Sequence, residues 1–305
     1  MLSSDDLRFF SVIATRASLA ETARVLNVTP SSVTQRLQGI EQKLRLKLVN
    51  RRGRATTLTD EGQLLAERAQ LIVAELDDLH ESLCDRKNTI VGRLRILAPL
   101  GFGNEYVAPL AAQFQRRHKD LSVELVLSDS PLQSTKQDWD VVIHIGTLPD
   151  SSLSKSFLAK NRRFLCAAPE YVAERGHPAT IADLRHHSCI ALRENDEDVT
   201  MWKVRAPGAA QFESIRIRPT LASNDGRVVK QWALGGNGIM LRSEWDVANE
   251  LRSGKLVRIL PQHELPSADI VALLGSAPRN RSARTMQFLQ QLREAFVQIP
   301  WPQTI

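Results

Sequence analysis

Cysteine is scarce in this chain of 305 residues, and long apolar runs are absent. The three cysteines, Cys84, Cys166 and Cys189, are far apart and form neither a disulfide framework nor a CxxC metal site. No apolar run approaches the roughly 18 residues that a membrane span needs. The first residues also lack the basic and apolar segments of a secretory signal. We therefore expect a cytoplasmic protein with no membrane partner, and neither a disulfide-stapled protein nor a zinc finger.

Catalytic signatures are missing as well. The sequence contains no GxSxG, HExxH or GxxxxGK[ST] motif. The stretch Gly101-Phe-Gly-Asn-Glu-Tyr106 lacks the third glycine of a dinucleotide loop, and His186-His187 has no matching third ligand nearby. We predict that the protein is not an enzyme and uses no metal or cofactor.

What the chain has in excess is positive charge near its beginning. It has 40 Lys and Arg residues against 34 Asp and Glu residues, a net charge of +6. Residues 1–60 hold ten bases and five acids, so they carry +5 of this charge. A local positive field favours a polyanionic partner such as nucleic acid. The alternative is a solvated basic face on a small helical domain.

Three short helices are predicted within the first 45 residues. Apolar spacing predicts the first over residues 5–16. The capping box Ser18-Leu-Ala-Glu21 begins the second, with the Glu21 carboxylate reaching back to the cap, and Asn27 suits its left-handed end. Thr29 then suits the N-cap of a third helix, with Pro30 at its first position. Two helices joined by so short a turn are typical of a helix-turn-helix.

The third helix, residues 30–44, has an apolar face and a polar face. Val33, Leu37, Ile40 and Leu44 repeat at helical spacing on the apolar one. The polar one carries hydroxyl and amide groups, which read base edges or hold phosphates in a major groove, and residues 30–39 contain no acid. We favour a DNA-recognition helix over the outer face of a small bundle. The DNA-binding candidates here are Thr29, Pro30, Ser31, Thr34, Gln35 and Gln38.

An arginine-rich segment follows. Residues 46–49 and 55–58 read as two short strands around a turn at 50–54. Arg51, Arg52 and Arg54 would repel one another at the tip of such a hairpin. A wing that touches phosphate or a minor groove explains them better.

A long helix is predicted from a cap at Thr59 to about residue 87. Leu65, Ile72 and Leu79 form one heptad series, and Ala69, Leu76 and Leu83 form another. Packing on the helix's own domain is one explanation. We favour a homodimer, because a two-fold protein matches two DNA half-sites.

Beyond residue 90, strand and helix patterns alternate. Strands at 92–98, 121–127, 140–145 and 164–168, with a helix at 102–117, predict a mostly parallel sheet with covering helices. Ligands of such sheets bind beyond the carboxyl ends of strands and at helix N-termini. Turn geometry, capping and core packing are the alternative roles of the residues there. The candidate effector-binding residues are Pro99, Leu100, Gly101, Phe102, Ser128, His144, Gly146, Trp202, Asn224 and Asp225.

These patterns resemble those of LysR-type transcriptional regulators. The departures include Ala17 for the usual glycine, and Pro30 at a position where a base-contacting glutamine is frequent. The stretches that carry the resemblance are Leu7-Arg-Phe-Phe-Ser-Val12, Ser18-Leu-Ala-Glu-Thr-Ala-Arg-Val-Leu-Asn-Val-Thr29, Val33-Thr-Gln-Arg-Leu37, Ile40-Glu-Gln-Lys-Leu44, Arg51-Arg-Gly-Arg54 and Leu58-Thr-Asp-Glu-Gly62, and later Ile145-Gly-Thr-Leu-Pro-Asp-Ser-Ser-Leu153, Arg163-Phe-Leu-Cys-Ala-Ala-Pro-Glu-Tyr171 and Gly235-Gly-Asn-Gly-Ile239.

The resemblance implies an α/β architecture in three parts. Residues 1–58 would form a winged helix-turn-helix, 59–87 a linker and dimerisation helix, and 92–305 a two-lobed effector-binding domain similar in fold to periplasmic binding proteins. Lobe I would take residues 92–162 and 268–305, and lobe II residues 163–267. The stretches Ala191-Leu-Arg-Glu-Asn195 and Ser223-Asn-Asp-Gly226, with Trp202, are similar to a subgroup that includes regulators of hydroxy-dicarboxylate use. In that subgroup an arginine is common where this chain has His144.

The implied function is sequence-specific regulation of transcription. The protein would bind an interrupted inverted repeat in double-stranded DNA as a homodimer or homotetramer, and a small organic anion would modulate it. RNA polymerase is a further candidate partner. Two alternatives remain: an α/β ligand-binding protein or enzyme with an incidental helical N-terminus, and a nucleoid-type architectural protein.

Overall fold

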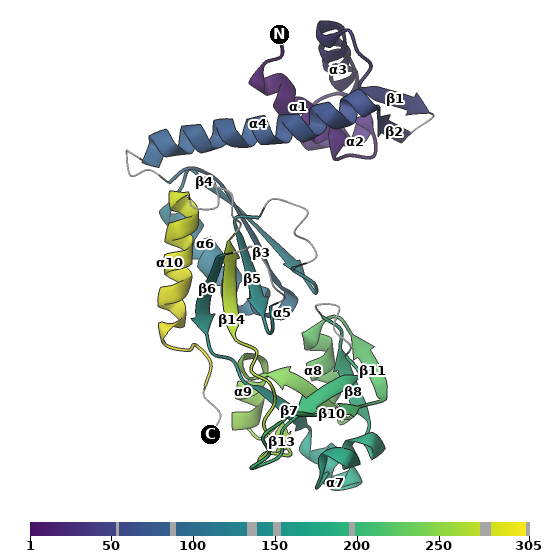
Figure 1. Cartoon of the computed structure of the whole chain (residues 1–305), viewed down its shortest axis with the longest axis vertical. Helices are drawn as coiled ribbons and strands as arrows, with labels where there is room; N and C mark the ends of the chain where they lie inside the picture. Colours follow the sequence, from purple (N-terminus) through teal and green to yellow (C-terminus); the bar gives the residue numbers. More distant parts are fainter. Residues whose placement is uncertain are drawn as a thin grey trace. The chain divides into compact units, whose positions relative to one another are not determined.

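A computed structural model describes residues 1–52, 55–85, 90–132, 139–148, 154–194, 199–274 and 282–302. The chain divides into two compact units, Met1–Thr89 (unit 1) and Ile90–Ile305 (unit 2). Figure 1 shows the helical unit 1 and the α/β unit 2, and each is described by itself. Every helix in the described ranges is too short or too polar to cross a membrane.

Unit 1 is a set of helices with one small hairpin. The caps predicted around the second and third helices are present. Asn27 has a φ of 54° at the end of α2, and the Thr29 side chain accepts a hydrogen bond from the Ser32 N–H at the start of α3. The elements are α1 (Ser4–Ala14), α2 (Leu19–Leu26), α3 (Pro30–Leu44), β1 (Val49–Arg52), β2 (Ala55–Leu58) and α4 (Asp60–Asp85).

The predicted capping box of α2 is half right. The Ser18 side chain accepts from the Glu21 N–H at 3.2 Å, as expected. The Glu21 carboxylate, however, accepts from the N–H of Ala17 at 3.1 Å, one residue before the cap. The start of the helix is stabilised from both sides, but the return bond reaches further than the motif implies.

The core of unit 1 confirms the predicted apolar face of α3. Val33, Leu37 and Ile40 are buried together with Phe10 of α1, and Leu44 packs at the edge of the same cluster. Burial of this stripe holds α3 in place and leaves its polar side to solvent.

The predicted hairpin strand at 46–49 is wrong. The strand is β1, Val49–Arg52, and it pairs antiparallel with β2 from Val49 opposite Leu58 to Arg52 opposite Ala55. Arg51 and Arg52 therefore lie in the strand instead of at the tip, while Arg54 lies outside the described residues. Strand formation depends on cross-strand backbone bonds, which arginine supplies as well as an apolar residue does.

Unit 2 contains two five-stranded sheets. The sheet of lobe I has the order β4-β3-β5-β14-β6, and that of lobe II the order β11-β8-β12-β7-β13, with a separate β9–β10 hairpin. The strands are β3 (Gly92–Pro99), β4 (Leu121–Ser128), β5 (Val141–Ile145), β6 (Ser154–Ala159), β7 (Arg163–Ala167), β8 (Cys189–Leu192), β9 (Met201–Val204), β10 (Glu213–Arg216), β11 (Pro219–Ser223), β12 (Ile239–Ser243), β13 (Val257–Ile259) and β14 (Ile270–Leu274).

Both sheets are mixed, so the prediction of mostly parallel sheets is wrong. In lobe I, β3 pairs parallel with β4 and β5, whereas β14 pairs antiparallel with β5 and β6. The chain leaves lobe I after β6 and returns at β14 (Figure 1), and the strands next to these crossings run antiparallel. Asn161 joins the two crossing segments, because its Nδ2 donates to the Ala268 carbonyl at 2.9 Å.

Helices cover the sheets of unit 2. The predicted helix at 102–117 begins two residues earlier and contains a π-helical turn at Gly103–Val107 between α5 and α6. In Figure 1, α10 and α6 lie beside the sheet of lobe I. The helices are α5 (Leu100–Phe102), α6 (Ala108–Arg117), α7 (Pro169–Arg175), α8 (Gly226–Leu234), α9 (Glu244–Arg252) and α10 (Ala283–Val297).

Candidate nucleic-acid interface and ligand pocket

The N-terminus of α3 presents a cluster of hydroxyl groups. The Thr29 Oγ1 atom lies 2.9 Å from Ser31 Oγ and 2.8 Å from Ser32 Oγ. All three residues are exposed, and the first turn of α3 contains no acid. Hydroxyl donors at a helix N-terminus suit a phosphate or a base edge. Ser32 was not predicted, although it directly follows Ser31 in the sequence.

The remaining predicted residues of α3 lie on the same solvent side. Pro30, Gln35 and Gln38 are exposed, and Thr34 is half-buried. The apolar core holds the opposite side of the helix, so these side chains point away from the unit. The structure thus brings the predicted helix residues together on one surface.

A buried acid ties α3 to the hairpin. The Glu41 carboxylate accepts from the Leu48 N–H at 2.9 Å and from Lys47 Nζ at 2.9 Å. Burial alone would raise the pKa of this carboxyl, but the hydrogen bonds from Lys47 and Leu48 outweigh it and lower the pKa. The turn before β1 is therefore anchored to α3.

Helix α4 has two apolar sides, one buried and one exposed. Ala69 is buried, and Leu65 is half-buried and packs against the apolar core of unit 1, so the two predicted heptad series do not lie wholly on a free surface. Ile72, Leu76 and Leu79 are 45%, 40% and 59% exposed. An exposed apolar stripe of this kind marks an interaction site. The predicted Leu83 lies in α4, but its side chain lies outside the described part of the chain.

A narrow pocket lies between the two lobes of unit 2. Lobe I contributes the ends of three strands and the start of α5, and lobe II contributes the ends of three strands and the starts of α8 and α9. Five predicted residues line it: Pro99, Leu100, Gly101, Phe102 and Asn224. The others that line it are Asp129, Ile145, Leu192, Glu194, Gly226, Arg242, Ser243 and Trp245.

Arg242 supplies a buried positive charge to this pocket. It is only 5% exposed, and its Nε donates to Asp246 Oδ2 at 2.8 Å. Burial disfavours its charged form, but the carboxylates of Asp246 and Glu194 outweigh that effect and raise its pKa. The guanidinium therefore stays charged. Sequence reasoning missed it, although an arginine after the apolar run Ile239-Met-Leu241 is a signal of a buried charge.

Trp245 lies in the first turn of α9 and packs against two aromatic residues of lobe I. Its ring packs edge-on to Phe102 with centroids 5.4 Å apart, and Tyr106 lies 6.0 Å away in a similar arrangement. The Tyr106 hydroxyl donates to the Trp245 carbonyl at 3.3 Å. Trp245 is 6% exposed, and its indole N–H has no hydrogen-bond partner among the described residues.

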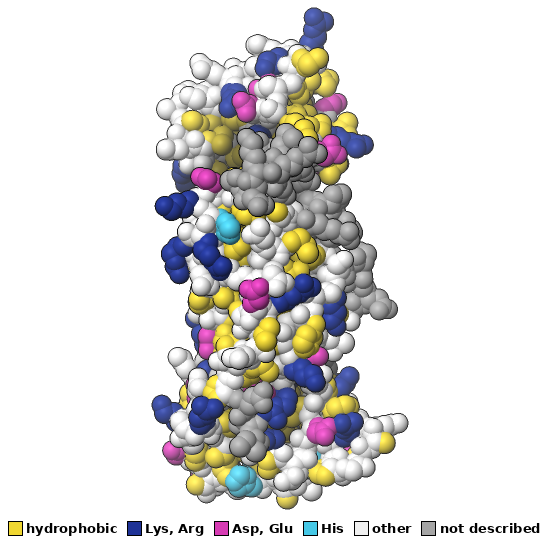
Figure 2. Space-filling view, turned by 90° about the vertical axis from the view of Figure 1, so that its left-hand side faces the viewer, with side chains coloured by type: hydrophobic (Ala, Val, Ile, Leu, Met, Phe, Trp, Pro, Cys, Tyr) yellow, Lys and Arg dark blue, Asp and Glu magenta, His cyan; other side chains and the backbone are white. Residues whose placement is uncertain are grey.

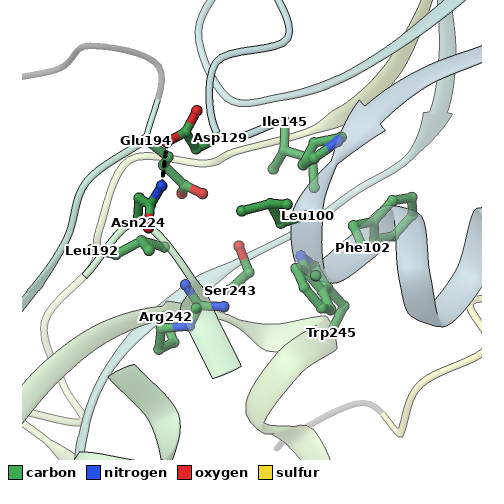
Figure 3. Close-up of a pocket in the computed structure, with 13 residues that line it drawn as sticks. Leu100, Phe102, Asp129, Ile145, Leu192, Glu194, Asn224, Arg242, Ser243 and Trp245 are labelled. Atoms are coloured by element: carbon green, nitrogen blue, oxygen red, sulfur yellow. Dashed lines mark hydrogen bonds between the residues drawn. The ribbon is translucent and has the colours of Figure 1, made fainter. Parts of the chain in front are cut away.

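A hydrogen bond crosses the pocket between the lobes. Asn224 Nδ2, after β11, donates to Asp129 Oδ2, after β4, at 2.7 Å. Figure 3 shows this bond with the Glu194 carboxylate beside it, and the Arg242, Ser243 and Trp245 side chains below. The pocket therefore has acceptors on one side and donors on the other.

Five predicted effector residues lie outside the pocket. Ser128 accepts from the Ser130 N–H, and Gly146 has a φ of 110° in the turn after β5. Asp225 caps α8 and pairs with Arg227 at 3.0 Å. His144 is buried with Nε2 3.1 Å from the Thr147 carbonyl, because alternation along β5 turns the next residue, Ile145, toward the pocket.

Trp202 lies in the core of lobe II, where it packs with Val204 and Ile215. It does not line this pocket, and it packs in the core as part of the β9–β10 hairpin. The sequence showed a large aromatic residue in a polar stretch, but not that its strand faces the core.

Two cysteines of unit 2 are buried thiols. Cys166 and Cys189 are free and fully buried. Burial raises the pKa of each to about 12, so both are protonated at neutral pH and unsuited to redox sensing. Across the described ranges, no group of three or more His, Cys, Asp or Glu side chains is arranged to hold a metal ion.

Comparison with known proteins gives two family matches and close relatives. Residues 4–63 match the bacterial regulatory helix-turn-helix protein of the lysR family, and residues 87–297 match the LysR substrate binding domain. The regulator DmlR of Escherichia coli K12 is 34% identical over 290 residues, covering 94% of this chain and 93% of DmlR. The activator TtdR of Escherichia coli UTI89 is 36% identical over 269 residues, covering 88% of this chain and 86% of TtdR.

Solved structures have a similar fold. CrgA, a LysR-type transcriptional regulator from Neisseria meningitidis, is 26% identical with a TM-score of 0.58, covering 97% of this chain and 99% of CrgA. Full-length AphB, a virulence activator of Vibrio cholerae, is 24% identical with a TM-score of 0.62, covering 95% of this chain and 98% of AphB, and shows the same fold.

Proposed function

The chain belongs to the LysR family of bacterial transcriptional regulators, and from this premise we propose how it recognises DNA and responds to an effector. Family membership makes it a DNA-binding regulator with a ligand-binding domain, and not an enzyme. We assign DNA binding to residues 1–58, dimerisation to 59–87 and effector binding to 92–305. Such a regulator works in the cytoplasm, where RNA polymerase is its further partner.

The observation that carries this proposal is the exposed, acid-free polar face of α3. Thr29, Ser31 and Ser32 form its hydroxyl cluster, and Gln35 follows one turn later. We propose that this face enters the major groove, with Thr34, Gln35 and Gln38 at base edges and the hydroxyls on phosphate. Pro30 opens the helix, and Arg51, Arg52 and Arg54 serve the wing.

The DNA site follows from the oligomer. The exposed stripe Ile72, Leu76 and Leu79 pairs with that of a second copy, so a homodimer presents two recognition helices. The target is then an interrupted inverted repeat in double-stranded DNA. Two dimers join through unit 2 to form a homotetramer.

The effector is a small organic anion bound between the lobes. Arg242 offers its buried charge, and the lining residues Leu100 and Asn224 come from different lobes. A ligand that binds one arrangement of the lobes better shifts the population of that arrangement. The shift changes the spacing of the recognition helices in the oligomer and so the affinity for DNA.

Selection of bound sequences from random duplex DNA tests the proposal. The full chain is used at two salt concentrations, because phosphate contacts make the affinity fall steeply with salt. We expect an enriched interrupted inverted repeat at both. Salt-sensitive binding without any enriched sequence would instead indicate an architectural protein and refute the proposal.

A further inference from the structure

The donor side of the pocket is built from three nearly consecutive residues. Arg242 and Ser243 end β12, and Trp245 lies in the first turn of α9. Arg242 uses only Nε in its hydrogen bond to Asp246. The Trp245 indole N–H is buried and has no hydrogen-bond acceptor among the residues that the structure describes, and Arg242 and Ser243 line the same pocket. An unused buried donor is costly, so a ligand that accepts from it gains affinity.

These donors are fixed before any ligand arrives. Asp246 holds the guanidinium of Arg242, and Asn161 Nδ2 donates to Ser243 Oγ at 3.0 Å. Phe102 and Tyr106 hold the Trp245 ring. In Figure 3 the three groups point toward the space beside Leu100. A planar carboxylate fits this arrangement, because its two oxygens accept from a guanidinium fork and from neighbouring donors.

Gly226 keeps the place for the guanidinium open. A Cβ at this position would lie 2.2 Å from Arg242 Nη2. The backbone at 226 is otherwise in a conformation that any residue adopts. The absence of a side chain at position 226 therefore leaves room for the guanidinium of Arg242, and the helix backbone does not itself require a glycine there.

The acceptor side has the opposite character. The carboxylates of Asp129 and Glu194 lie across the pocket from Arg242, with Asn224 beside them (Figure 3). A second carboxylate of a ligand would meet like charges there, which is unfavourable. A hydroxyl or ammonium group would instead donate to them.

We propose that the effector is a small carboxylic acid whose other end carries a hydrogen-bond donor, a hydroxyl or an ammonium group, and not a second carboxylate. Its carboxylate binds Arg242, Ser243 and Trp245, and its donor faces Asp129 and Glu194. This inference rests on the proposed function, because it names the ligand class of the same pocket; with an ammonium group the ligand is a zwitterion, and its carboxylate is the anionic group of that proposed function. The negative charge of Asp129 and Glu194 determines which group the far end of the ligand carries, so these two acids determine the specificity of the pocket.

Calorimetric titration of the full chain with matched acids tests the ligand class. The series is butanoate, 4-hydroxybutanoate, 4-aminobutanoate and succinate, together with the three-carbon acids propanoate, 3-hydroxypropanoate, 3-aminopropanoate and malonate. We expect a hydroxy or amino acid to bind about tenfold or more tightly than the unsubstituted acid of its length, the size of one added charged hydrogen bond. Whichever of the hydroxy and amino acids binds more tightly shows whether the donor at the far end of the effector is a hydroxyl or an ammonium group. Tightest binding by succinate or malonate, or no binding by any acid, would overturn the proposal.

Variants of each side sharpen the test. Replacing both acids, Asp129→Asn with Glu194→Gln, keeps the Asn224 hydrogen bond and removes the charge. We expect this double variant to bind succinate about as tightly as the hydroxy or amino acid of the same length. Gly226→Ala, which displaces the guanidinium, should weaken every acid about tenfold or more. An unchanged preference in the double variant would refute the role of the acceptor side.

Trp245→Phe removes the indole donor, and Trp301→Phe is its matched control. Trp301 is also buried at 4% exposure with an indole N–H that lacks a partner in the described ranges, but it does not line the pocket. We expect only Trp245→Phe to weaken the acids. Equal losses in the two variants would show an effect of folding and not of the donor. The DNA selection described above is independent, so a chain that binds an inverted repeat but ignores these acids would refute this inference alone.

Discussion

The two units place their functional side chains in different ways. In unit 1, the surface proposed to read DNA comes from one helix and the hairpin after it, and the side chains that the helix contributes face solvent, with Thr34 half-buried. In unit 2, the pocket draws on residues from Pro99 to Trp245, and its key groups Arg242 and Trp245 are buried. Local periodicity reveals the first kind of site, whereas the second exists only once the two sheets are assembled.

The two units also differ in how their charged side chains are distributed. Residues 1–60 carry most of the net positive charge of the chain. Over the face of unit 2 in the lower part of Figure 2, side chains of both signs are interspersed, with apolar ones scattered among them. A field of one sign suits a polyanion, while a buried charge between two lobes suits a small ligand.

The largest expected effect comes from the stripe on α4. Leu76→Gln with Leu79→Gln should leave unit 1 folded, because both side chains are exposed. It should lower affinity for an inverted repeat about a thousandfold, since the second half-site no longer adds to binding. Sedimentation gives the oligomeric state, and titration of one-site and two-site duplexes gives the affinities.

The matched control is Leu46→Gln, another exposed leucine of unit 1 that lies off this helix. It should leave the oligomer intact. A double variant on α4 that still sediments like the parent would contradict dimerisation through this stripe.

Core truncation separates the two units. Leu37→Ala removes a fully buried side chain of unit 1 and should lower its free energy of unfolding by about 3 kcal/mol. Leu94→Ala should lower the free energy of unfolding of unit 2 by a similar amount, because Leu94 is fully buried in lobe I. Calorimetric scans should show each variant shifting a different transition, and a single shared shift would mean that the units unfold together.

Sequence patterns predicted most of unit 1. Thr29 and Pro30 set the start of α3, and the apolar repeat from Val33 fixed which side faces inward. These are interactions within a few residues, so a single sequence reveals them. The start of β1 was misplaced, because Leu46 is apolar yet exposed, and the strand is set by pairing with β2.

The pocket was only half predictable. Pro99–Phe102 and Asn224 follow strands, so the rule for the ends of strands found them. Arg242 and Trp245 lie where the chain passes from β12 to α9, and nothing local indicates that this junction faces lobe I. His144 and Trp202 do not line the pocket, because which side of a strand faces the pocket depends on the sheet around it.

A smaller effect distinguishes side chains of unit 1 that contact phosphate from side chains that contact base edges. Gln35→Ala should weaken the specific site by about 1–3 kcal/mol and leave random DNA nearly unchanged, as expected for a base contact. Arg51→Ala should weaken both alike and reduce the salt slope by about one. Titrations of operator and random duplex at several salt concentrations measure this, and equal losses for both variants on both DNAs would contradict the division of roles.

The smallest expected effect is the response of unit 1 to acid. Lys47 and the Leu48 N–H lower the pKa of the buried Glu41 below its usual value of 4.5 despite its burial. The folded pKa lies below the unfolded one, so this stabilisation is fully present above about pH 4.5 and is lost as the pH falls through the folded pKa. Glu41→Gln should lower stability at pH 7 by about 1.5 kcal/mol, the lower end of the range for a hydrogen bond to a charged group, and flatten the fall below pH 4.5. Denaturant unfolding between neutral pH and the acid range measures both, with the exposed Glu75→Gln as control. Parallel curves for Glu41→Gln and the parent would mean that Glu41 does not anchor the hairpin through its charge, and unit 1 would then owe its geometry to the apolar core alone.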